Sequence, residues 1–299
     1  MSITVKTISA DEHLAFVAAR GQASFLQLPA WGKAKPEWRS ESVGFFDGDT
    51  LTGVGLVLYR QLPKLPRYLA YLPEGPVLDW NRPDVDAHLE ALIAHARRNK
   101  AFAVRIGPTV VHHRWLAPTV KAAIADPEIT ALSQATPDET TLTGTRVLRT
   151  LDHLGWQPQA EGHGFAAGQP KFNYQLRLTD AEGTPLTDEQ LLKGMNQLWR
   201  RNIKKADKLG VTVTRGERAD LARFHHIYLE TAERDHFTGR GLSYFETMWD
   251  ALNTEEPDRM RVYLAEHDGD LVAATTFIRV GTHAWYSYGA STTAKREVR

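Results

Sequence analysis

The chain contains no cysteine among its 299 residues. Disulfide bonds, thiolate nucleophiles and cysteine-ligated zinc are therefore excluded. The chain also lacks an apolar run near the roughly 18 residues that a membrane-spanning helix needs, and the first residues, MSITVKTISADEH, lack the basic and then apolar pattern of a signal peptide. We therefore expect a cytoplasmic protein.

Several catalytic motifs are missing as well. The sequence has no Walker loop, no GxGxxG, no HExxH and no GxSxG, so nucleotide hydrolysis, dinucleotide redox chemistry, zincin chemistry and a covalent serine mechanism lose their usual sequence support. The twelve histidines do not repeat a metal-ligand spacing. We expect neither a metal nor a cofactor, and we assign no catalytic residue.

The charge is balanced, with 36 basic and 36 acidic residues. This balance argues against a general nucleic-acid coat, although not against one local contact. With 42% apolar and 24% charged residues, the chain has the composition of an ordinary globular protein. Its length is enough for two domains of about 150 residues each.

Residue patterns in the two halves predict the same order of elements. In the first half we expect a strand over residues 3–7, helices over 9–20 and 29–38, two strands joined at Asp47-Gly48, a strand at YLAYL, a helix over 84–99 and a strand at FAVRI. In the second half we expect a strand at FNYQLRL, a helix over 192–211, a strand at VTVTR, helices over 219–234 and 244–252, two strands joined at Asp268-Gly269 and a strand at HAWYSYG. Each half thus has a helix pair before an Asp-Gly hairpin. We predict an α+β fold with domains over 1–150 and 151–299.

Residues 192–211, LKGMNQLWRRNIKKADKLGV, form the most amphipathic stretch of the chain. At about 100° per residue, the apolar side chains fall on one arc and the basic ones on the opposite arc. We therefore expect a helix whose apolar arc is buried and whose opposite arc is cationic. Thr187 and Gln190 match a capping box, and Gly210 stands where helices commonly end. The basic arc is either an ordinary solvated face or an anion site for phosphates.

Tyrosines in the last predicted strand form a second candidate group. Alternation along a strand would place Tyr286 and Tyr288 on one face and Trp285 on the other. The cluster either packs in the core or presents its hydroxyls to a polar ligand.

Five stretches together resemble the Fem family of nonribosomal peptidyl transferases, in family order across nearly the whole chain. They are QLPAWGKAKPEW, YLPEGPV, RRNIKKADKLGV, IYLETAERDHF and YSYGASTTAKR. The resemblance implies two domains of the GNAT acyltransferase fold, without the coiled-coil arm of some members. It implies transfer of glycine, alanine or serine from aminoacyl-tRNA to an amine of the peptide stem of lipid II or UDP-MurNAc-pentapeptide, at the inner membrane face.

The same resemblance implies substrate-binding residues. The diphosphate of the precursor would be held by Lys35 and by Arg200 or Arg201, with Lys204 on the same basic arc. Tyr286 or Tyr288 would lie beside the peptide stem. Arginine suits a diphosphate because its planar fork makes paired, charge-assisted hydrogen bonds.

Two departures from the family pattern limit this transfer of roles. Many members have an acidic residue before a proline at the end of the FAVRI strand, whereas this chain has Gly107 before Pro108. Family chains also continue beyond the YxYG piece to a Phe-Lys piece that lines the site. The sequence ends at Arg299 without it, so we expect the second domain to be incomplete at its C-terminus.

Two other functions remain open. One is an N-acyltransferase that uses acyl-coenzyme A, although no glycine-rich turn opens a helix for its pyrophosphate. The other is a non-enzymatic phosphate- or RNA-binding module that uses the basic helix alone. Binding by such a module would weaken steeply with salt.

Overall fold

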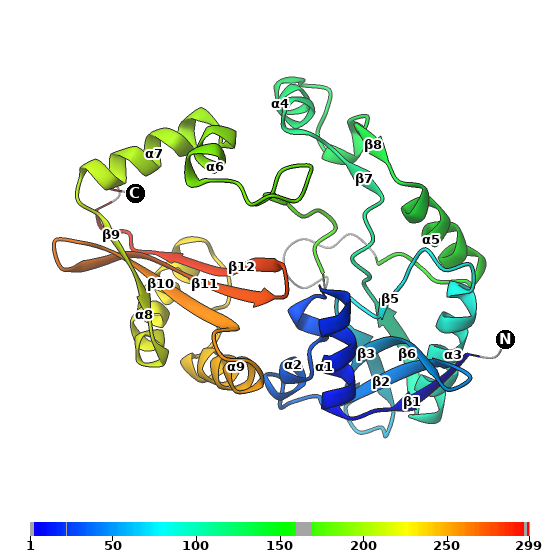
Figure 1. The fold of residues 1–299 in the computed structure, drawn as a ribbon. Coiled ribbons are helices and arrows are strands. Elements are labelled where there is room, and N and C mark those ends of the chain that lie inside the picture. The colour runs from blue at the N-terminus through cyan, green and yellow to red at the C-terminus, as the bar shows by residue number, and fades with distance from the viewer. Residues whose placement is uncertain (1–2, 22, 160–168, 296–297, 299) are drawn as a thin grey trace. The chain divides into compact units, whose positions relative to one another are not determined.

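The computed structural model describes residues 3–21, 23–159, 169–295 and 298. The chain forms two compact units, Met1–Gln169 and Pro170–Arg299. The sequence predicts a domain boundary at residue 150, whereas the first unit of the structure extends to Gln169. Figure 1 shows the elements of each unit.

The first unit is built around one mixed sheet with the strand order β1-β2-β3-β4-β6, in which β5 also pairs with β3. Its strands are β1 (Ile3–Thr7), β2 (Arg39–Asp47), β3 (Thr50–Gln61), β4 (Tyr68–Leu72), β5 (Val77–Leu78) and β6 (Ala101–Ile106). Its helices are α1 (Ala10–Arg20), η1 (Phe25–Gln27), α2 (Pro29–Lys33), α3 (Val85–Arg98), α4 (Ala117–Ala125), η2 (Leu132–Gln134) and α5 (Leu142–His153), and β7 (His113–Arg114) pairs with β8 (Glu139–Thr140).

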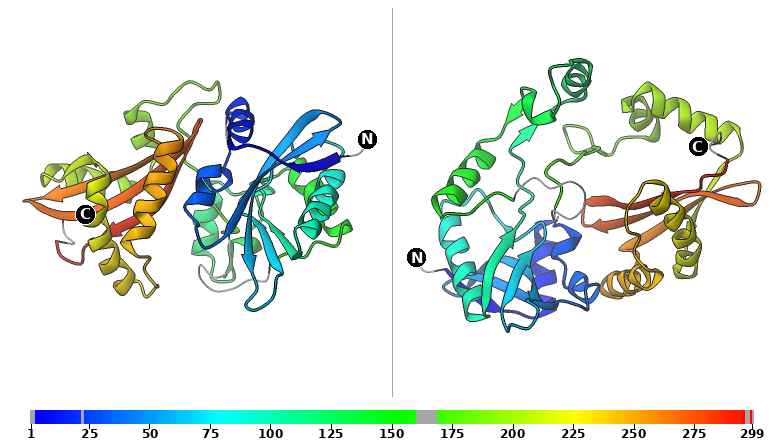
Figure 2. Two further views of the ribbon diagram at one scale, coloured as in Figure 1. Left: turned by 90° about the horizontal axis from the view of Figure 1, so that it is seen from below. Right: turned by 180° about the vertical axis from the view of Figure 1, so that it is seen from behind.

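Helices cover both faces of this sheet (Figure 2). The short helices α1 and α2 contact β2 and β3, whereas α3 contacts β1 and β6. Leu92 and Ala96 of α3 pack into a buried cluster with strand residues such as Phe45 and Tyr59. This core fixes β4 and β6, the sheet's parallel strand pair, near whose carboxyl ends Tyr71 pairs with Arg105.

The second unit has a four-stranded sheet with the order β12-β11-β10-β9. Its strands are β9 (Thr212–Gly216), β10 (Met260–His267), β11 (Asp270–Val280) and β12 (His283–Ser291). Its helices are α6 (Asp188–Gly194), α7 (Gln197–Lys208), η4 (Arg218–Asp220), α8 (Leu221–Arg234) and α9 (Leu242–Glu255). The buried side chains of α8 and α9, among them Phe224 and Phe245, form the core with one face of the sheet.

The two units repeat one arrangement. Strand order β1-β2-β3-β4 with helices α1 and α2 corresponds to β9-β10-β11-β12 with α8 and α9. Both Asp-Gly hairpins are present, and each has a bulge close to its turn, after Phe45 and after Ala265. The repeated order predicted from the sequence is therefore observed.

Three sequence-based predictions differ from the structure. The helix over 192–211 is two helices, because Met195 is extended and Asn196 caps a new helix by accepting a hydrogen bond from the Trp199 amide at 2.9 Å. The stretch FNYQLRL is not a strand. The helix over 29–38 ends at Lys33, because the fixed φ and missing N–H of Pro36 stop it from continuing. Part of the terminal stretch STTAKREVR lies outside the described residues.

Candidate substrate-binding site

An arginine and three tyrosines meet at one edge of the second unit. Tyr228 comes from α8, Tyr244 from the first turn of α9 and Tyr288 from β12, while Arg240 lies just before α9. The hydroxyls of Tyr244 and Tyr288 are 3.1 Å apart, and the Arg240 guanidinium lies 4.6 Å from the centre of the Tyr244 ring. We call these four residues the Arg240 cluster.

The aromatic core holds this cluster in place. The Phe245 ring lies edge-on to Tyr228 and to Tyr288, with centroids 5.1 Å apart in both pairs. Tyr228 is only 4% exposed, and its hydroxyl accepts a hydrogen bond from the Arg240 backbone at 3.5 Å. The phenol rings are therefore packed in the interior, and Tyr244 and Tyr288 extend their hydroxyls to a partly exposed edge.

Arg240 forms no ion pair with a carboxylate among the described residues. Burial acts to lower the pKa of Arg240, but the neighbouring phenols of Tyr244 and Tyr288 outweigh it, and the pKa is raised. The guanidinium therefore keeps its charge and has N–H donors available for a ligand. A guanidinium that has no carboxylate partner among the described residues and lies beside phenol hydroxyls can bind an anion with several oxygens, such as a carboxylate or a phosphate.

A β-bulge in β12 separates the two predicted tyrosines. Phe277 pairs with Tyr286 and Thr276 pairs with Tyr288, so Ser287 is the extra residue. Tyr288 packs on Tyr228 on the helix side of the sheet, whereas Tyr286 contacts Phe277 and is 65% exposed. The prediction that the two tyrosines share a face is wrong, because an extra residue reverses the alternation.

Tyr286 lies across Gly289, where any added Cβ would collide with the tyrosine ring. The glycine of the YxYG piece thus has a packing reason. Only a residue without a Cβ lets the ring lie against the strand.

The basic arc predicted for residues 192–211 lies mainly on α7. Arg201 and Lys204 are exposed. Arg200 is half-buried, and its guanidinium donates a hydrogen bond to the Lys193 carbonyl at 2.9 Å. The apolar arc is exposed as well, with Trp199 at 61% and Ile203 at 43%. The expectation that this arc is buried is therefore wrong for the described structure.

Lys35 lies in the first unit, just after α2, and is half-buried. Its ammonium group stands 5.0 Å from the centre of the Trp31 ring, a cation–π distance. The ring of Trp31 is buried, so the stem of Lys35 is held close to the body of the unit.

Polar and aromatic side chains also gather at the carboxyl ends of β4 and β6. Tyr71 pairs with Arg105 across these strands, and the Tyr71 hydroxyl accepts a hydrogen bond from Gln169 at 2.8 Å. Burial raises the pKa of Tyr71. Glu74, which accepts a hydrogen bond from Ser24 at 2.6 Å, lies next to Gly107. The contact with Gly107 is made by the backbone nitrogen of Glu74, while its carboxylate is held by Ser24.

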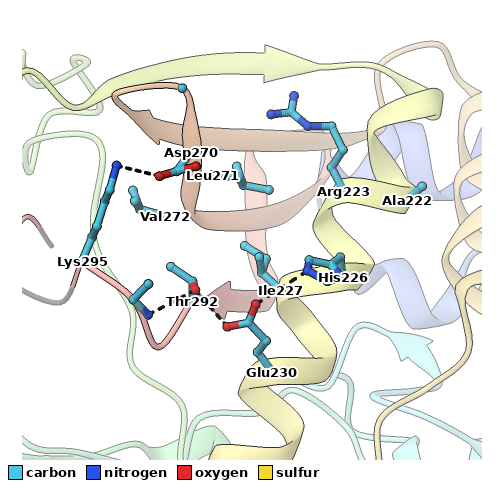
Figure 3. A pocket seen from close by; sticks show the side chains of 12 residues that line it. Ala222, Arg223, His226, Ile227, Glu230, Asp270, Leu271, Val272, Thr292 and Lys295 are labelled. Atoms are coloured by element: carbon cyan, nitrogen blue, oxygen red, sulfur yellow. Dashed lines mark hydrogen bonds and ion pairs between the residues drawn. The ribbon is translucent and has the colours of Figure 1, made fainter.

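A separate cavity of about 660 Å³ lies in the second unit between α8, the start of β11 and the segment after β12 (Figure 3). The charged groups that line it are already paired. Lys295 is 2.7 Å from Asp270, and Glu230 accepts hydrogen bonds from Thr292 at 2.9 Å and from the Thr293 amide. None of the predicted site residues lines this cavity, which makes it a weaker candidate than the Arg240 cluster.

The described part of the chain offers neither a metal-binding cluster nor a membrane-spanning helix. It holds no group of three or more histidine, aspartate or glutamate side chains arranged to bind a metal ion. None of its helices is long and apolar enough to cross a membrane.

Tyr288 was predicted as a site residue from the sequence, whereas Arg240, Tyr228 and Tyr244 were not. These residues come from three separate segments, and no local pattern sets them apart. Only the four-residue spacing of Arg240 and Tyr244, at the start of a predicted helix, could have drawn attention to the pair.

Known proteins are similar to this chain at the levels of sequence and fold. The sequence profile of the FemAB family matches residues 8–271. The chain is 31% identical over 251 residues to a lipid II:glycine glycyltransferase of Staphylococcus saprophyticus, and 30% identical over 251 residues to one of Staphylococcus aureus. Each alignment covers 83% of this chain and 52% of the relative, so the chain spans about half the length of the curated relatives it matches.

A crystal structure of FemX superposes on 98% of this chain and 82% of its own with a TM-score of 0.70 at 22% identity, which establishes a common fold. The predicted α+β class is confirmed by the mixed sheets and their helices. The family match over most of the sequence shows that the chain belongs to the FemAB family.

Proposed function

We propose that this protein transfers an amino acid of the glycine, alanine or serine class from aminoacyl-tRNA to an amine of the peptide stem of lipid II or UDP-MurNAc-pentapeptide. The relatives named lipid II:glycine glycyltransferase support this class of reaction. The observation that carries the proposal for this chain is the Arg240 cluster, in which a guanidinium without a carboxylate partner among the described residues stands beside tyrosine hydroxyls.

In the proposed reaction the amine of the stem attacks the carbonyl carbon of the aminoacyl ester. A new amide bond forms and the ester bond to the ribose oxygen breaks, while the amine gives up one proton and the ribose hydroxyl gains one. The ester supplies the driving force, so the protein chiefly holds the amine and the carbonyl together and stabilises the oxyanion.

The diphosphate of the precursor is the anion that we assign to the Arg240 cluster. Arginine binds phosphate oxygens in pairs through its planar fork, and partial burial strengthens such bonds. The arginines of α7, Arg200 and Arg201, are the other candidates. They are less confined, because no residue of α7 is buried.

The most informative experiment for the reaction supplies the protein with lipid II and tRNAs charged with glycine, alanine or serine. We expect mass spectrometry to find one added residue on the peptide stem with at least one donor. Acyl-coenzyme A serves as a parallel donor. A product with acyl-coenzyme A alone would assign the chain to the other acyltransferase class, and no product with any donor would reject the proposal.

Charge removal at the residues implied by the family resemblance gives a second prediction. We expect Lys35→Ala and Arg201→Gln each to weaken binding of UDP-MurNAc-pentapeptide by roughly tenfold or more, because a charge-assisted hydrogen bond contributes about 1.5–3 kcal/mol. Isothermal titration calorimetry measures the affinity, and circular dichroism checks folding. An unchanged affinity in a folded variant would remove that residue from the diphosphate site.

A further inference from the structure

Helix α7 exposes its whole circumference. None of its twelve residues is buried, and three large apolar side chains are open to solvent, Leu198 at 53%, Trp199 at 61% and Ile203 at 43%. An ordinary surface helix buries its apolar stripe against the core. The apolar stripe of α7 has no such cover in the described structure.

The two arcs of α7 are sharply separated. At 100° per residue, Leu198, Trp199, Ile203, Ala206 and Leu209 just after the helix lie on one arc. The opposite arc carries Arg200, Arg201, Lys204, Lys205 and Lys208, with Asp207 as the acidic residue of the helix. These five cations form no ion pair with a carboxylate in the part of the chain that the structure describes.

We propose that α7 lies in the plane of an anionic lipid bilayer. Its apolar arc would enter the boundary between headgroups and acyl chains, and its cations would contact the anionic headgroups. At 1.5 Å per residue the helix offers about 18 Å of length to that surface. The proposal deepens the proposed function and rests on it for its setting, because lipid II is itself a membrane lipid.

Charge complementarity and the exposed apolar arc together favour this occupant. A nucleic acid would contact the cations but leave Trp199 and Ile203 in water. A second copy of the chain would cover the apolar arcs, but the cations on the opposite side of the helix would gain no anionic partner. An anionic bilayer is complementary to both arcs at once.

The test measures flotation of the full chain with vesicles of phosphatidylcholine alone and of phosphatidylcholine with a third of phosphatidylglycerol. We expect binding to the anionic vesicles that is at least about tenfold tighter than binding to the neutral ones and that weakens with salt. We expect Trp199→Ala with Ile203→Ala, and separately Lys205→Gln with Lys208→Gln, each to lower the affinity by about tenfold or more.

The matched control changes two residues of another exposed helix. Lys121→Gln with Ile124→Ala removes one charge and one apolar side chain from α4, where Ile124 is 81% exposed. This variant should bind anionic vesicles like the unaltered chain. Circular dichroism confirms that every variant is folded.

Three outcomes would overturn the proposal: no binding to anionic vesicles, equal binding by the α7 variants and the α4 control, or α7 variants that lose tRNA binding or self-association while vesicle binding is unchanged. The vesicles contain neither lipid II nor charged tRNA. A failure of the transfer reaction therefore leaves this result intact, and a failure here leaves the transfer reaction untouched.

Discussion

Arg240 and Tyr288 show at the scale of single residues how the fold builds a site from ordinary side chains. Tyr288 could be selected from the sequence because it belongs to the YxYG piece. Arg240 could not, because its importance comes from the phenols that α8, α9 and β12 bring beside it. The sequence alone does not show whether an arginine in a loop is solvated or packed against other side chains.

Removing one hydroxyl tests the role of the phenols. We expect Tyr288→Phe to weaken binding of UDP-MurNAc-pentapeptide about three- to tenfold, because the lost hydroxyl bonds Tyr244 and faces the anion site, and one such bond contributes about 1 kcal/mol. Titration calorimetry measures the affinity, and Tyr263→Phe is the control. A loss with Tyr286→Phe but none with Tyr288→Phe would place the ligand on the other face of the sheet.

The buried carboxylate of Glu41 makes a prediction about pH. Burial raises its pKa, but hydrogen bonds from His95, Thr7 and Tyr59 outweigh burial and lower the pKa from 4.5 to about 2. A carboxyl group with a depressed pKa stabilises the fold above the unfolded value and loses that contribution as the pH falls. The free energy of unfolding of the first unit should therefore fall by about 3 kcal/mol between pH 4.5 and 2.

Urea unfolding across that pH range measures the effect. Glu41→Gln should reduce the pH dependence of the unfolding free energy between pH 4.5 and 2. The exposed control Glu90→Gln should keep that dependence. An equally steep profile in Glu41→Gln would assign the acid sensitivity to other groups.

At the scale of helices and strands, local chemistry allowed many elements to be predicted. The capping boxes at Ser9 and Thr187 and the turns at Asp47-Gly48 and Asp268-Gly269 stand where the sequence placed them. The bulge at Ser287 and the exposure of α7 could not be predicted, because both depend on what the neighbouring strands and helices do. Periodicity predicts an apolar arc but not the surface that covers it.

The break between α6 and α7 gives a prediction about one cap. Asn196 accepts a hydrogen bond from the Trp199 amide, and replacing such a cap by alanine costs about 1 kcal/mol. We expect Asn196→Ala to speed hydrogen exchange of the α7 amides about fivefold, since α7 has no buried face to hold it. The mid-helix variant Asn202→Ala is the control, and equal exchange in the two variants would show that the cap does not limit the helix.

At the scale of the whole molecule, two units with the same order of helices and strands place different chemistry at their sheet ends. The first unit offers Lys35 beside Trp31 and a carboxylate at Glu74. The second offers the Arg240 cluster and the basic helix α7. The reaction that we propose needs contacts to an anionic precursor and to a charged donor, and this distribution of groups supplies candidates for both.

The most direct test of the anion site at the Arg240 cluster measures kcat/KM for transfer from the active charged tRNA to UDP-MurNAc-pentapeptide. It compares three proteins: the unaltered chain, Arg240→Gln and the exposed control Arg177→Gln. We expect Arg240→Gln to lower kcat/KM roughly 30-fold or more, because a charge-assisted bond to the diphosphate contributes about 2–3 kcal/mol. We expect Arg177→Gln to keep the original kcat/KM. Equal rates in all three proteins would contradict the assignment of the anion site to the Arg240 cluster.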